Sequence, residues 1–384
     1  MLPLIKDARK AIAGVVKPTP VVYSASLGKL YNKEVYLKLE NLQKTGSFKP
    51  RGAYNKIRSL SEDEKKRGVI TASSGNHAQG VAWAAALLGV NSVIVMPETT
   101  PIVKYMATRG YGGEGGEGGE VVFHGSSFDE AFGHAEGLAR EEGRIFIHPF
   151  DDELIMAGQG TIGLEIVEAV PEVDTVVVPV GGGGLISGIA TAVKETKKGV
   201  KIIGVEVEGS ASCIRSLKEG RPVGELKEGP TIADGIAIKK VGEKTFPVIK
   251  KYVDDVVSVS EETIAAAILK LLERKKLITE GAGAVALAAA MEEKLPASAK
   301  KVVLVLSGGN IDVTTLDRVI RLGLLREGRI RRFSTVVGDL PGSLARLTSA
   351  IAEMKGNIVH IVHQRDAVDV PVGEARVEVI IEVE

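Results

Sequence analysis

Short apolar stretches alternate with longer amphipathic or alanine-rich stretches through most of the chain. The first, Val35–Glu40, alternates between apolar and polar residues, which is typical of a half-buried strand. Further runs of strand length follow: Val69–Ala72, Ser92–Met96, Val121–His124, Ile145–His148, Thr175–Val180, Lys201–Val207 and Lys301–Leu306. Helical patterns lie between them, for example Ala78–Leu88. This alternation predicts an α/β fold with largely parallel sheets covered by helices, in which ligands bind beyond the carboxyl ends of strands.

Two uncharged runs, Val69–Pro97 and Thr175–Val193, have the length of a membrane span. Polar residues interrupt the first and four successive glycines interrupt the second. Such breaks are incompatible with a continuous apolar helix. Each run instead predicts a buried strand, a loop and a packed helix, so no membrane partner is expected.

The composition narrows the kinds of partner. The 384 residues include 49 basic and 49 acidic side chains, a balance that does not favour nucleic acid or a membrane surface and leaves small molecules as the expected ligands. The single cysteine, Cys213, is expected to be a buried apolar residue in a cytoplasmic protein. The segment Met1–Val16 has the charges of an amphipathic helix and not the pattern of a signal peptide.

The stretch Lys44–Ala53 (KTGSFKPRGA) contains a lysine suited to covalent chemistry. Because Lys49 precedes Pro50, it fits poorly inside a helix, so we expect it at a strand-to-helix junction with the helix beginning near the proline. Burial beside Phe48 would lower the pKa of the amine and leave it nucleophilic, as a Schiff base to a carbonyl cofactor requires. Since most lysines near turns are solvated charges, this assignment depends on the rest of the chain.

Three polar or glycine-rich loops follow predicted strands. Ser73–His77 (SSGNH) precedes a helix whose first N–H groups suit an anion such as a carboxylate, although its Ser and Asn are also ordinary caps. Gly181–Leu185 (GGGGL) lets backbone N–H groups close around a phosphate and matches neither the dinucleotide nor the P-loop pattern. Ser307–Asn310 (SGGN) offers a hydroxyl to a ring nitrogen, or serves as a turn with a capping serine. Together, the three loops and the lysine favour one site.

Two further segments bear on domain organisation. Gly112–Gly119 reads GGEGGEGG and is predicted to be a flexible surface loop. The basic segment Arg326–Arg332 marks a boundary, so we divide the chain into 1–325 and 326–384. The second part predicts a strand, a helix and two more strands, at Phe333–Gly338, Asp339–Met354, Asn357–Gln364 and Ala375–Val383.

These motifs resemble those of the pyridoxal-phosphate β-eliminating family that includes threonine dehydratase, serine dehydratase and serine racemase. The matching stretches are Ser47–Ala53 (SFKPRGA), Ser73–Gly80 (SSGNHAQG), Gly181–Leu185 (GGGGL), Thr231–Ile236 (TIADGI), Glu280–Ala284 (EGAGA) and Ser307–Asn310 (SGGN). The resemblance implies a tryptophan-synthase-β-like fold of two open parallel-sheet lobes, the smaller at roughly 45–150. Residues 326–384 resemble the start of an α+β ACT module without its last helix and strand, and this domain order resembles that of threonine dehydratases of isoleucine biosynthesis.

The resemblance also implies roles for particular residues. Lys49 would hold pyridoxal phosphate as a covalent aldimine and take the Cα proton, and Ser74 would be a second acid or base. The remaining implied contacts are Phe48 beside the pyridine ring, Asn76 on the 3-hydroxyl, Gly181, Gly182, Gly183, Gly184 and Leu185 on the phosphate, Ser307 at the ring nitrogen, and Ser73, Ser74, Gly75 and His77 on the substrate carboxylate. The implied reaction converts L-threonine to 2-oxobutanoate and ammonia, and L-serine to pyruvate.

Several matters stay open. Relatives bind a divalent cation through residues matching Glu206, Ser210 and an aspartate that is Ser212 here, so a monovalent or divalent cation is undecided. The ACT-like module suggests an amino-acid or nucleotide effector, and a homo-oligomer, dimer or tetramer, is expected. His360 and His363 are taken as separate surface histidines in preference to a metal site.

Other functions compete with this assignment. Serine racemase and serine dehydratase are alternatives of the same fold, whereas O-acetylserine sulfhydrylases carry Asn-Thr-Gly where this chain has Asn76, His77 and Ala78. A nicotinamide dehydrogenase would use Glu206 as its ribose-binding acid but lacks the third glycine. A non-catalytic amino-acid-responsive protein would require degraded catalytic loops, and these loops retain their motifs.

Overall fold

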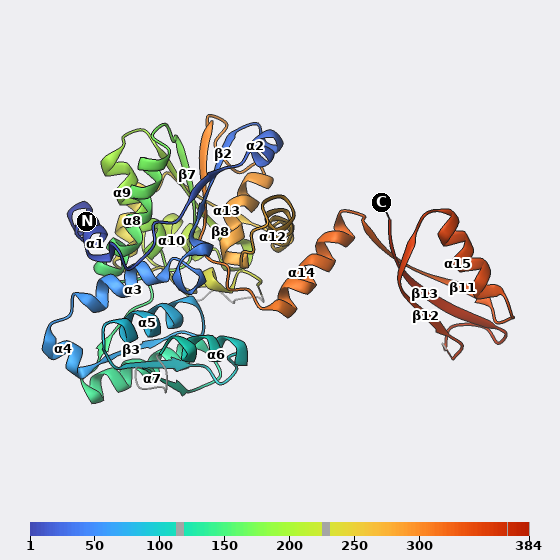
Figure 1. Cartoon of the computed structure of the whole chain (residues 1–384), viewed down its shortest axis with the longest axis horizontal. Helices are drawn as coiled ribbons and strands as arrows, with labels where there is room; N and C mark the ends of the chain where they lie inside the picture. Colours follow the sequence, from blue (N-terminus) through green and yellow to red (C-terminus); the bar gives the residue numbers. More distant parts are fainter. Residues whose placement is uncertain (113–118, 225–230, 367, 384) are drawn as a thin grey trace. The chain divides into compact units, whose positions relative to one another are not determined.

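The computed structural model describes residues 1–112, 119–224, 231–366 and 368–383. The described residues form two compact units, Met1–Asp312 and Val313–Glu384. Within the first unit, a larger lobe and a smaller lobe are each built on their own sheet (Figure 1). Residues 113–118, which belong to the predicted glycine-rich loop, lie outside the described residues.

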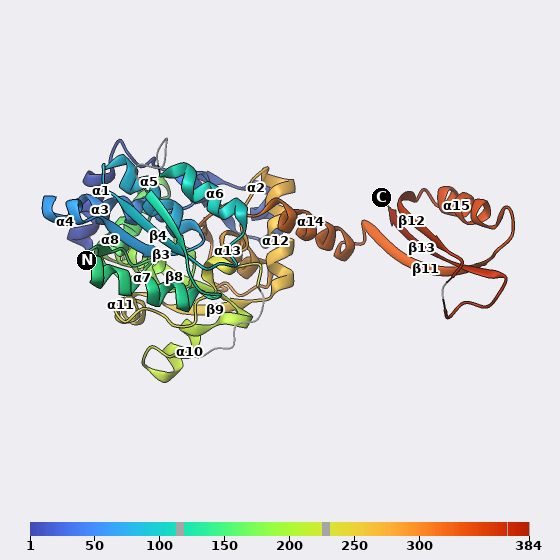
Figure 2. The same cartoon turned by 90° about the horizontal axis from the view of Figure 1, so that it is seen from below.

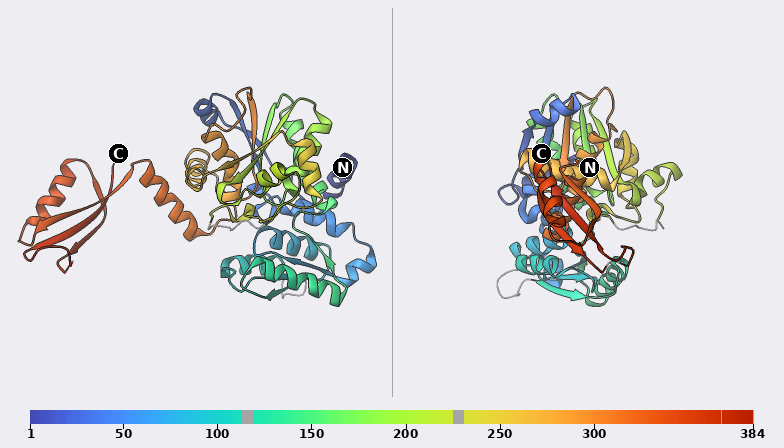
Figure 3. Two further views of the ribbon diagram at one scale, coloured as in Figure 1. Left: turned by 180° about the vertical axis from the view of Figure 1, so that it is seen from behind. Right: turned by 90° about the vertical axis from the view of Figure 1, so that its right-hand side faces the viewer.

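The larger lobe contains a mostly parallel sheet in the order β1-β2-β10-β7-β8-β9. Only β1 runs antiparallel to its neighbour β2. The strands are β1 (Val21–Tyr23), β2 (Glu34–Leu39), β7 (Thr175–Pro179), β8 (Lys201–Val207), β9 (Asp255–Val259) and β10 (Lys301–Leu306). The view from behind shows strands from distant parts of the sequence side by side in this sheet (Figure 3). The parallel sheet confirms the prediction, whereas β1 and β9 were not predicted because neither forms a long apolar run.

Helices cover both faces of this sheet, and glycines allow two of them to approach closely. The helices are α1 (Leu2–Ile12), α2 (Ala25–Tyr31), α8 (Glu153–Ala169), α9 (Gly184–Thr196), α10 (Ser212–Glu219), α11 (Thr245–Tyr252), α12 (Glu261–Lys275) and α13 (Gly281–Met291). A Cβ atom on Gly188 of α9 would lie 2.3 Å from the carbonyl oxygen of Met156 on α8. The two backbones can therefore pack together only because Gly188 has no side chain.

The smaller lobe contains a parallel sheet in the order β5-β4-β3-β6, packed with helices (Figure 1). Its elements are α4 (Glu62–Arg67), β3 (Val69–Ala72), α5 (Asn76–Leu87), β4 (Ser92–Met96), α6 (Ile102–Tyr111), β5 (Gly119–Phe123), α7 (Phe128–Glu142) and β6 (Ile145–Phe146). Ile70, Ala72, Val93 and Val95 of β3 and β4 are buried, as expected for central parallel strands.

The chain between β2 and the first helix of the smaller lobe differs from the prediction. Lys49 does not directly follow a strand, because two 3₁₀ turns, Glu40–Leu42 and Lys44–Gly46, come between β2 and α3 (Lys49–Arg58). Thr45 and Gly46 adopt φ values of 58° and 72°, which turn the chain before the helix. The start of the helix beside Pro50 is as predicted.

The second unit contains α14 (Val313–Arg326), β11 (Ile330–Gly338), α15 (Ser343–Glu353), β12 (Asn357–Gln364) and β13 (Glu374–Glu382). Its antiparallel sheet has the order β11-β13-β12, and α15 covers one face (Figure 2). The core of this unit contains Ile351, Val377, Val379 and Ile381. The division between the units falls at 312/313, ahead of α14, and not at the predicted 325/326, because α14 contacts β11.

Predictions about Cys213 and about the two histidines, and the membrane-span question, can each be compared with the fold. Cys213 is buried, as expected. His360 and His363 are exposed on β12 and pair with Ile380 and Val377 of β13. Since alternate residues of a strand point to opposite faces, the two histidines lie on opposite faces of the sheet. None of the described helices combines the length and the apolar character that spanning a bilayer requires.

Candidate functional site

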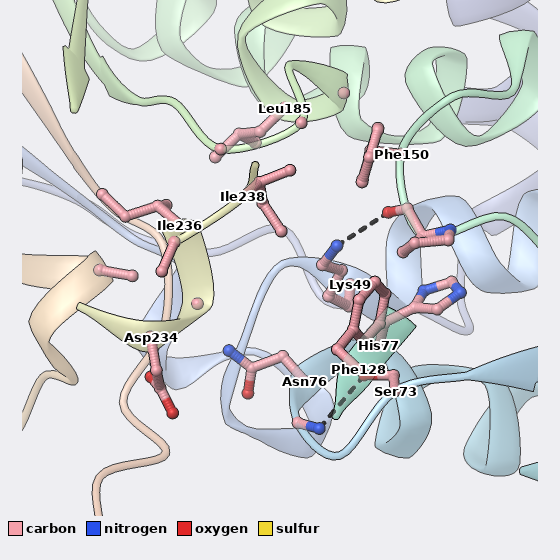
Figure 4. A pocket seen from close by; sticks show the side chains of 18 of the residues that line it. Lys49, Ser73, Asn76, His77, Phe128, Phe150, Leu185, Asp234, Ile236 and Ile238 are labelled. Carbon is pink, nitrogen blue, oxygen red and sulfur yellow. Dashed lines mark hydrogen bonds between the residues drawn. The ribbon is translucent and has the colours of Figure 1, made fainter. Parts of the chain in front are cut away.

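The carboxyl ends of both sheets of the first unit open into one cavity of about 760 Å³. The predicted Lys49, the loop Ser73–His77, the glycine loop and Ser307 all line it. Figure 4 shows Lys49 with Leu185, Ile238 and Phe150 on one side and Ser73, Asn76 and Asp234 on the other. The fold therefore brings the predicted site residues together, although they are far apart in the sequence.

Lys49 is the first residue of α3, and its side chain extends into the cavity. Nζ donates a hydrogen bond to the carbonyl oxygen of Pro149 at 2.8 Å, drawn as a dashed line from Lys49 in Figure 4. The same atom lies 5.1 Å from the centre of the Phe48 ring. Burial lowers the pKa of the Lys49 amine to about 8, against the opposing effect of Glu280. A much larger share of this amine is therefore unprotonated at neutral pH than of a solvated lysine, as the sequence predicted.

The loop Ser73–His77 joins β3 to α5 at the edge of the cavity. The Oγ atom of Ser73 accepts a hydrogen bond from the backbone N–H of Gly75 at 3.2 Å, and α5 begins without a side-chain cap. Its first N–H groups are thus available to an anion. Burial keeps the pKa of His77 well below its ordinary value, and its Nε2 atom lies 3.0 Å from the Ile147 carbonyl oxygen. A neutral, engaged imidazole brings no positive charge to the loop.

The tetraglycine segment turns directly from β7 into α9. Gly183 has φ of +93°, and α9 begins without a side-chain cap, so the first N–H groups of the helix are open to a ligand. A Cβ atom on Gly182 would lie 2.3 Å from the Phe150 ring. Thr245 fixes the segment from behind because its Oγ1 donates to the Gly182 carbonyl oxygen at 2.7 Å. Neither Phe150 nor Thr245 was identified from the sequence, since both lie outside the recognised motifs.

The segment after β6 supports both Lys49 and the glycines. Asp151 accepts hydrogen bonds from the backbone N–H groups of Lys244 at 2.8 Å and Thr245 at 3.1 Å, which ties this segment to the start of α11. His148 Nδ1 accepts from the Asp151 N–H at 2.8 Å. Burial lowers the pKa of His148 to about 4, so this imidazole too is neutral beside Lys49.

A chain of hydrogen bonds crosses the cavity floor between the two lobes. Asn76 Nδ2 donates to Glu280 Oε1 at 2.7 Å, and Asn76 Oδ1 accepts from Asn310 Nδ2 at 2.7 Å. Burial raises the pKa of Glu280 to about 8, with Asp234 acting in the same direction. Glu280 and Asn310 lie within recognised motifs, but the sequence did not indicate that their side chains meet Asn76.

Ser307 is buried beneath the same cavity, and its hydroxyl donates to the Ala282 carbonyl oxygen at 3.3 Å. The oxygen of this hydroxyl keeps lone pairs with which it can accept a further hydrogen bond. No charge is introduced by this side chain, in contrast to an aspartate at the same place.

The residues of the undecided cation site lie apart from the lining of the cavity. The carboxylate of Glu206 accepts from the backbone N–H groups of Cys213 and Ile214, both at 2.8 Å, and burial raises the pKa of Glu206 to about 7. Within the part of the chain that the structure describes, the buried hydroxyl of Ser210 has no hydrogen-bond partner. Among the described residues, no three His, Cys, Asp or Glu side chains are grouped to hold a metal ion.

Comparison with known proteins identifies the family. The family model described as pyridoxal-phosphate dependent enzyme matches residues 12–308. The chain belongs to this family. It is 51% identical over 379 residues to the L-threonine ammonia-lyase of Thermotoga maritima, covering 98% of this chain and 92% of that protein.

Two solved structures of the family are also similar. The processed form of threonine deaminase isoform 2 from Solanum lycopersicum is 41% identical, with a TM-score of 0.77, over 83% of this chain and 92% of that one. Maize serine racemase is 36% identical, with a TM-score of 0.78, over 85% of this chain and 98% of that one. As in these relatives, the chain has the α/β fold of the pyridoxal-phosphate enzymes.

The residues of the cavity fit the family's cofactor. The Lys49 amine, with its lowered pKa, can react with the aldehyde of the cofactor. The start of α9 has no side-chain cap and follows glycines, so its backbone N–H groups can bind the phosphate. The hydroxyl of Ser307 and the amide of Asn76 supply uncharged polar groups at the cavity wall. The chain is therefore an enzyme of pyridoxal-phosphate chemistry with a cavity able to hold that group.

Proposed function

We propose that this protein is an L-threonine ammonia-lyase, which converts L-threonine to 2-oxobutanoate and ammonia. The observation that supports it most is the identity of 51% to the Thermotoga maritima enzyme over nearly the whole chain. The cavity lined by the Lys49 amine and by the starts of α5 and α9, neither of which has a side-chain cap, also supports it. We propose that L-serine is a second substrate and gives pyruvate.

Lys49 holds the cofactor and is the base in this proposal. Pyridoxal phosphate supplies, when bound, an electron-withdrawing ring that stabilises negative charge at the substrate Cα. The Lys49 amine has a pKa of about 8, so it can accept the Cα proton at neutral pH. The proton removed from Cα is balanced by one delivered to the β-hydroxyl, which would then leave as water. Hydrolysis of the released enamine returns one water and gives the 2-oxo acid and ammonia.

The other residues bind and orient. The N–H groups at the start of α5 and the hydroxyls of Ser73 and Ser74 would bind the substrate carboxylate, and Ser74 would also be a second acid or base. Because the His77 imidazole is neutral and engaged with Ile147, its part in carboxylate binding would come from its backbone N–H. Phe48 would lie beside the cofactor ring and Ser307 at its nitrogen, and Gly181–Leu185 would bind the phosphate.

The test is to incubate the holoenzyme with L-threonine and with L-serine and to quantify 2-oxo acid and ammonia. Equimolar 2-oxobutanoate and ammonia from L-threonine are expected. The alternative supported by the likeness to maize serine racemase is the interconversion of L- and D-serine. Chiral chromatography that detected D-serine as the main product, with no 2-oxobutanoate from L-threonine, would establish the alternative and exclude the proposal.

A second test addresses Lys49 itself. Borohydride treatment of the holoenzyme, followed by peptide mass analysis, should place the added cofactor mass on Lys49. Lys49→Ala should lose both the mass and turnover. Lys44→Ala is the matched control, because Lys44 is an exposed lysine of the preceding turn. Retained turnover in Lys49→Ala would show that another residue is the base.

The second unit is proposed to be regulatory. After α14, the elements follow in the order strand, helix, strand, strand, which supports the proposal of an ACT-like module. We propose that it responds to an amino acid or nucleotide in a cytoplasmic homo-oligomer, dimer or tetramer. Activity assays with and without isoleucine, valine and nucleotides test the response to an effector, and light scattering measures the oligomeric state. An unchanged rate with every one of these compounds would argue against regulation.

A further inference from the structure

The amide of Asn76 is held at both ends, and the chemistry of its partners fixes which end faces which. The carbonyl oxygen of Thr45 can only accept, so the atom of Asn310 at 2.7 Å from it must be the donor Nδ2. The same Nδ2 lies 2.7 Å from Asn76, whose atom there must be the acceptor Oδ1. Asn76 Nδ2 is therefore at the opposite end, where it donates to Glu280 Oε1.

One hydrogen of the Asn76 amide is left over. Nδ2 carries two hydrogens, and Glu280 takes one of them. The second has no acceptor among the described residues, and Asn76 lines the cavity. A ligand that offers a hydrogen-bond acceptor at this wall is thus favoured over one that offers a donor.

The backbone is shaped to leave room for this chain of side chains. A Cβ atom on Gly46 would lie 2.3 Å from Asn310 Oδ1, and a Cβ atom on Gly308 would lie 2.2 Å from Glu280 Oε1. Thr45, whose carbonyl fixes Asn310, has φ of 58°, a left-handed conformation that is unfavourable for a non-glycine residue. Strain retained at this one carbonyl is consistent with a functional constraint.

We propose that Asn310 and Glu280 are positioning residues that fix the Asn76 amide with its free N–H directed at an anionic oxygen of the bound cofactor. The assignment rests on the proposed function, in which that oxygen belongs to the ring hydroxyl of pyridoxal phosphate. Because Asn76 is on α5 of the smaller lobe, whereas Glu280 and Asn310 belong to the larger lobe, the donor is fixed only while the lobes keep this arrangement.

The decisive variant is Asn310→Asp, which keeps the shape but places an acceptor opposite Thr45 O, Asn76 Oδ1 and, at 3.4 Å, Gln79 Oε1. The Asn76 amide should then turn over, so that its oxygen faces the anionic ring oxygen. Loss of a hydrogen bond to a charged group should weaken cofactor affinity about 10- to 100-fold. The ring hydroxyl should also ionise at higher pH, because its anion has lost a donor.

The measurement is a titration of apoprotein with pyridoxal phosphate, followed by a pH titration of the absorbance of the bound cofactor. Glu280→Gln retains an acceptor for Asn76 and should stay within about twofold of the wild type. Glu280→Ala removes this acceptor while Asn310 still holds the Asn76 oxygen, so it should weaken cofactor affinity by more than about twofold but less than Asn310→Asp does. Asn55→Asp is the matched control, because Asn55 likewise donates to a backbone carbonyl, that of Leu154, at 2.8 Å.

A purely structural role would lower the melting temperature of Asn310→Asp and Asn55→Asp alike without moving cofactor affinity or the absorbance titration, and that result overturns the inference. If Asn310→Asp does not fold, the cofactor affinity and absorbance titration of Glu280→Ala are compared with those of Glu280→Gln instead. Failure of the wild type to bind pyridoxal phosphate would instead contradict the proposed function. Normal wild-type binding with unchanged Asn310→Asp and Glu280→Ala refutes only the positioning role.

Discussion

Replacing Arg51 by methionine removes a buried guanidinium that joins α3 to α8 and to the 3₁₀ turn Glu40–Leu42, two residues from Lys49. Its Nε donates to Glu40 Oε2 at 2.8 Å, and its NH1 donates to Glu165 Oε1 at 2.6 Å and to Thr161 Oγ1 at 3.0 Å. Its NH2 donates to Glu40 Oε1 and Glu165 Oε2, both at 2.9 Å. Arg51 and Glu40 are both 0% exposed, so water cannot replace these contacts.

The expected loss of stability in Arg51→Met comes from the Glu40 carboxylate, which stays buried without its main partner. Without Arg51, the cation nearest Glu40 is Lys38, at 3.8 Å, which also serves Glu165. Breaking a buried pair by removing one partner costs about 3–5 kcal/mol, whereas a surface pair is worth about 0–1 kcal/mol. Because folded proteins are stable by only about 5–15 kcal/mol, Arg51→Met should lower the free energy of unfolding by a large fraction.

The loss should depend on pH. Burial tends to raise the pKa of Glu40, but the charge and hydrogen bonds of Arg51, together with Lys38 and Thr19, outweigh burial and hold this pKa below its ordinary value. In the wild type, the stability from Glu40 is therefore present above its unfolded pKa and is lost as the pH falls through the folded value. In Arg51→Met, burial is no longer opposed by Arg51, so the pKa of Glu40 rises. The variant is then stabilised as the pH falls and Glu40 becomes protonated. The deficit relative to wild type should shrink in acid.

The assay is urea unfolding of the apoprotein, followed by the fluorescence of Trp83, the only tryptophan of the chain. Trp83 contacts Tyr54 of α3, with ring centres 6.1 Å apart, so it reports on the packing of this helix. Arg58→Met is the control, since Arg58 is an exposed arginine of the same helix. Arg51→Lys, which keeps the charge without the planar geometry, should lie between them. A loss in Arg51→Met no larger than in Arg58→Met would refute the reasoning.

Three further predictions concern the cavity. The rate at which the apoprotein captures pyridoxal phosphate should rise with pH and reach half its maximum near pH 8, because the unprotonated Lys49 amine is the nucleophile; stopped-flow absorbance measures it. Gly182→Ala should lower the affinity for pyridoxal phosphate at least about tenfold in an equilibrium titration, since the new Cβ meets the Phe150 ring at 2.3 Å. Lys104→Ala should change the urea-unfolding free energy by less than about 1 kcal/mol, although Lys104 pairs with Asp234 at 2.6 Å, because both side chains are partly exposed.

The local pattern of apolar and polar residues was sufficient to predict much of the fold. β3, β4, β8 and β10 have the predicted bounds, because continuous apolar runs bounded by polar residues favour buried strands. The short β1 and the partly exposed β9 were missed, since neither has such a run. The boundary before α14 was also missed, because an amphipathic helix does not reveal from its sequence which unit it packs against.

Some residues of the candidate site could be predicted from the sequence, and others could not. Ser73–His77, Gly181–Leu185 and Ser307 could be identified from their residue types and their place after a strand, and Lys49 from its place before Pro50. Phe150 and Thr245 could not be identified, since their part depends on contact with Gly182, which no local pattern encodes.

The sequence by itself determined the kinds of groups available: an amine before a proline, a run without side chains, polar loops at strand ends, and apolar runs that pair into parallel sheets. Only the tertiary structure decided how these groups are tuned. The lowered pKa of Lys49 comes from burial within the cavity, and the orientation of the Asn76 amide comes from Glu280 and Asn310, which lie more than two hundred residues away in the chain. Desolvation and hydrogen-bond direction depend on neighbours in space, and those neighbours are set by folding.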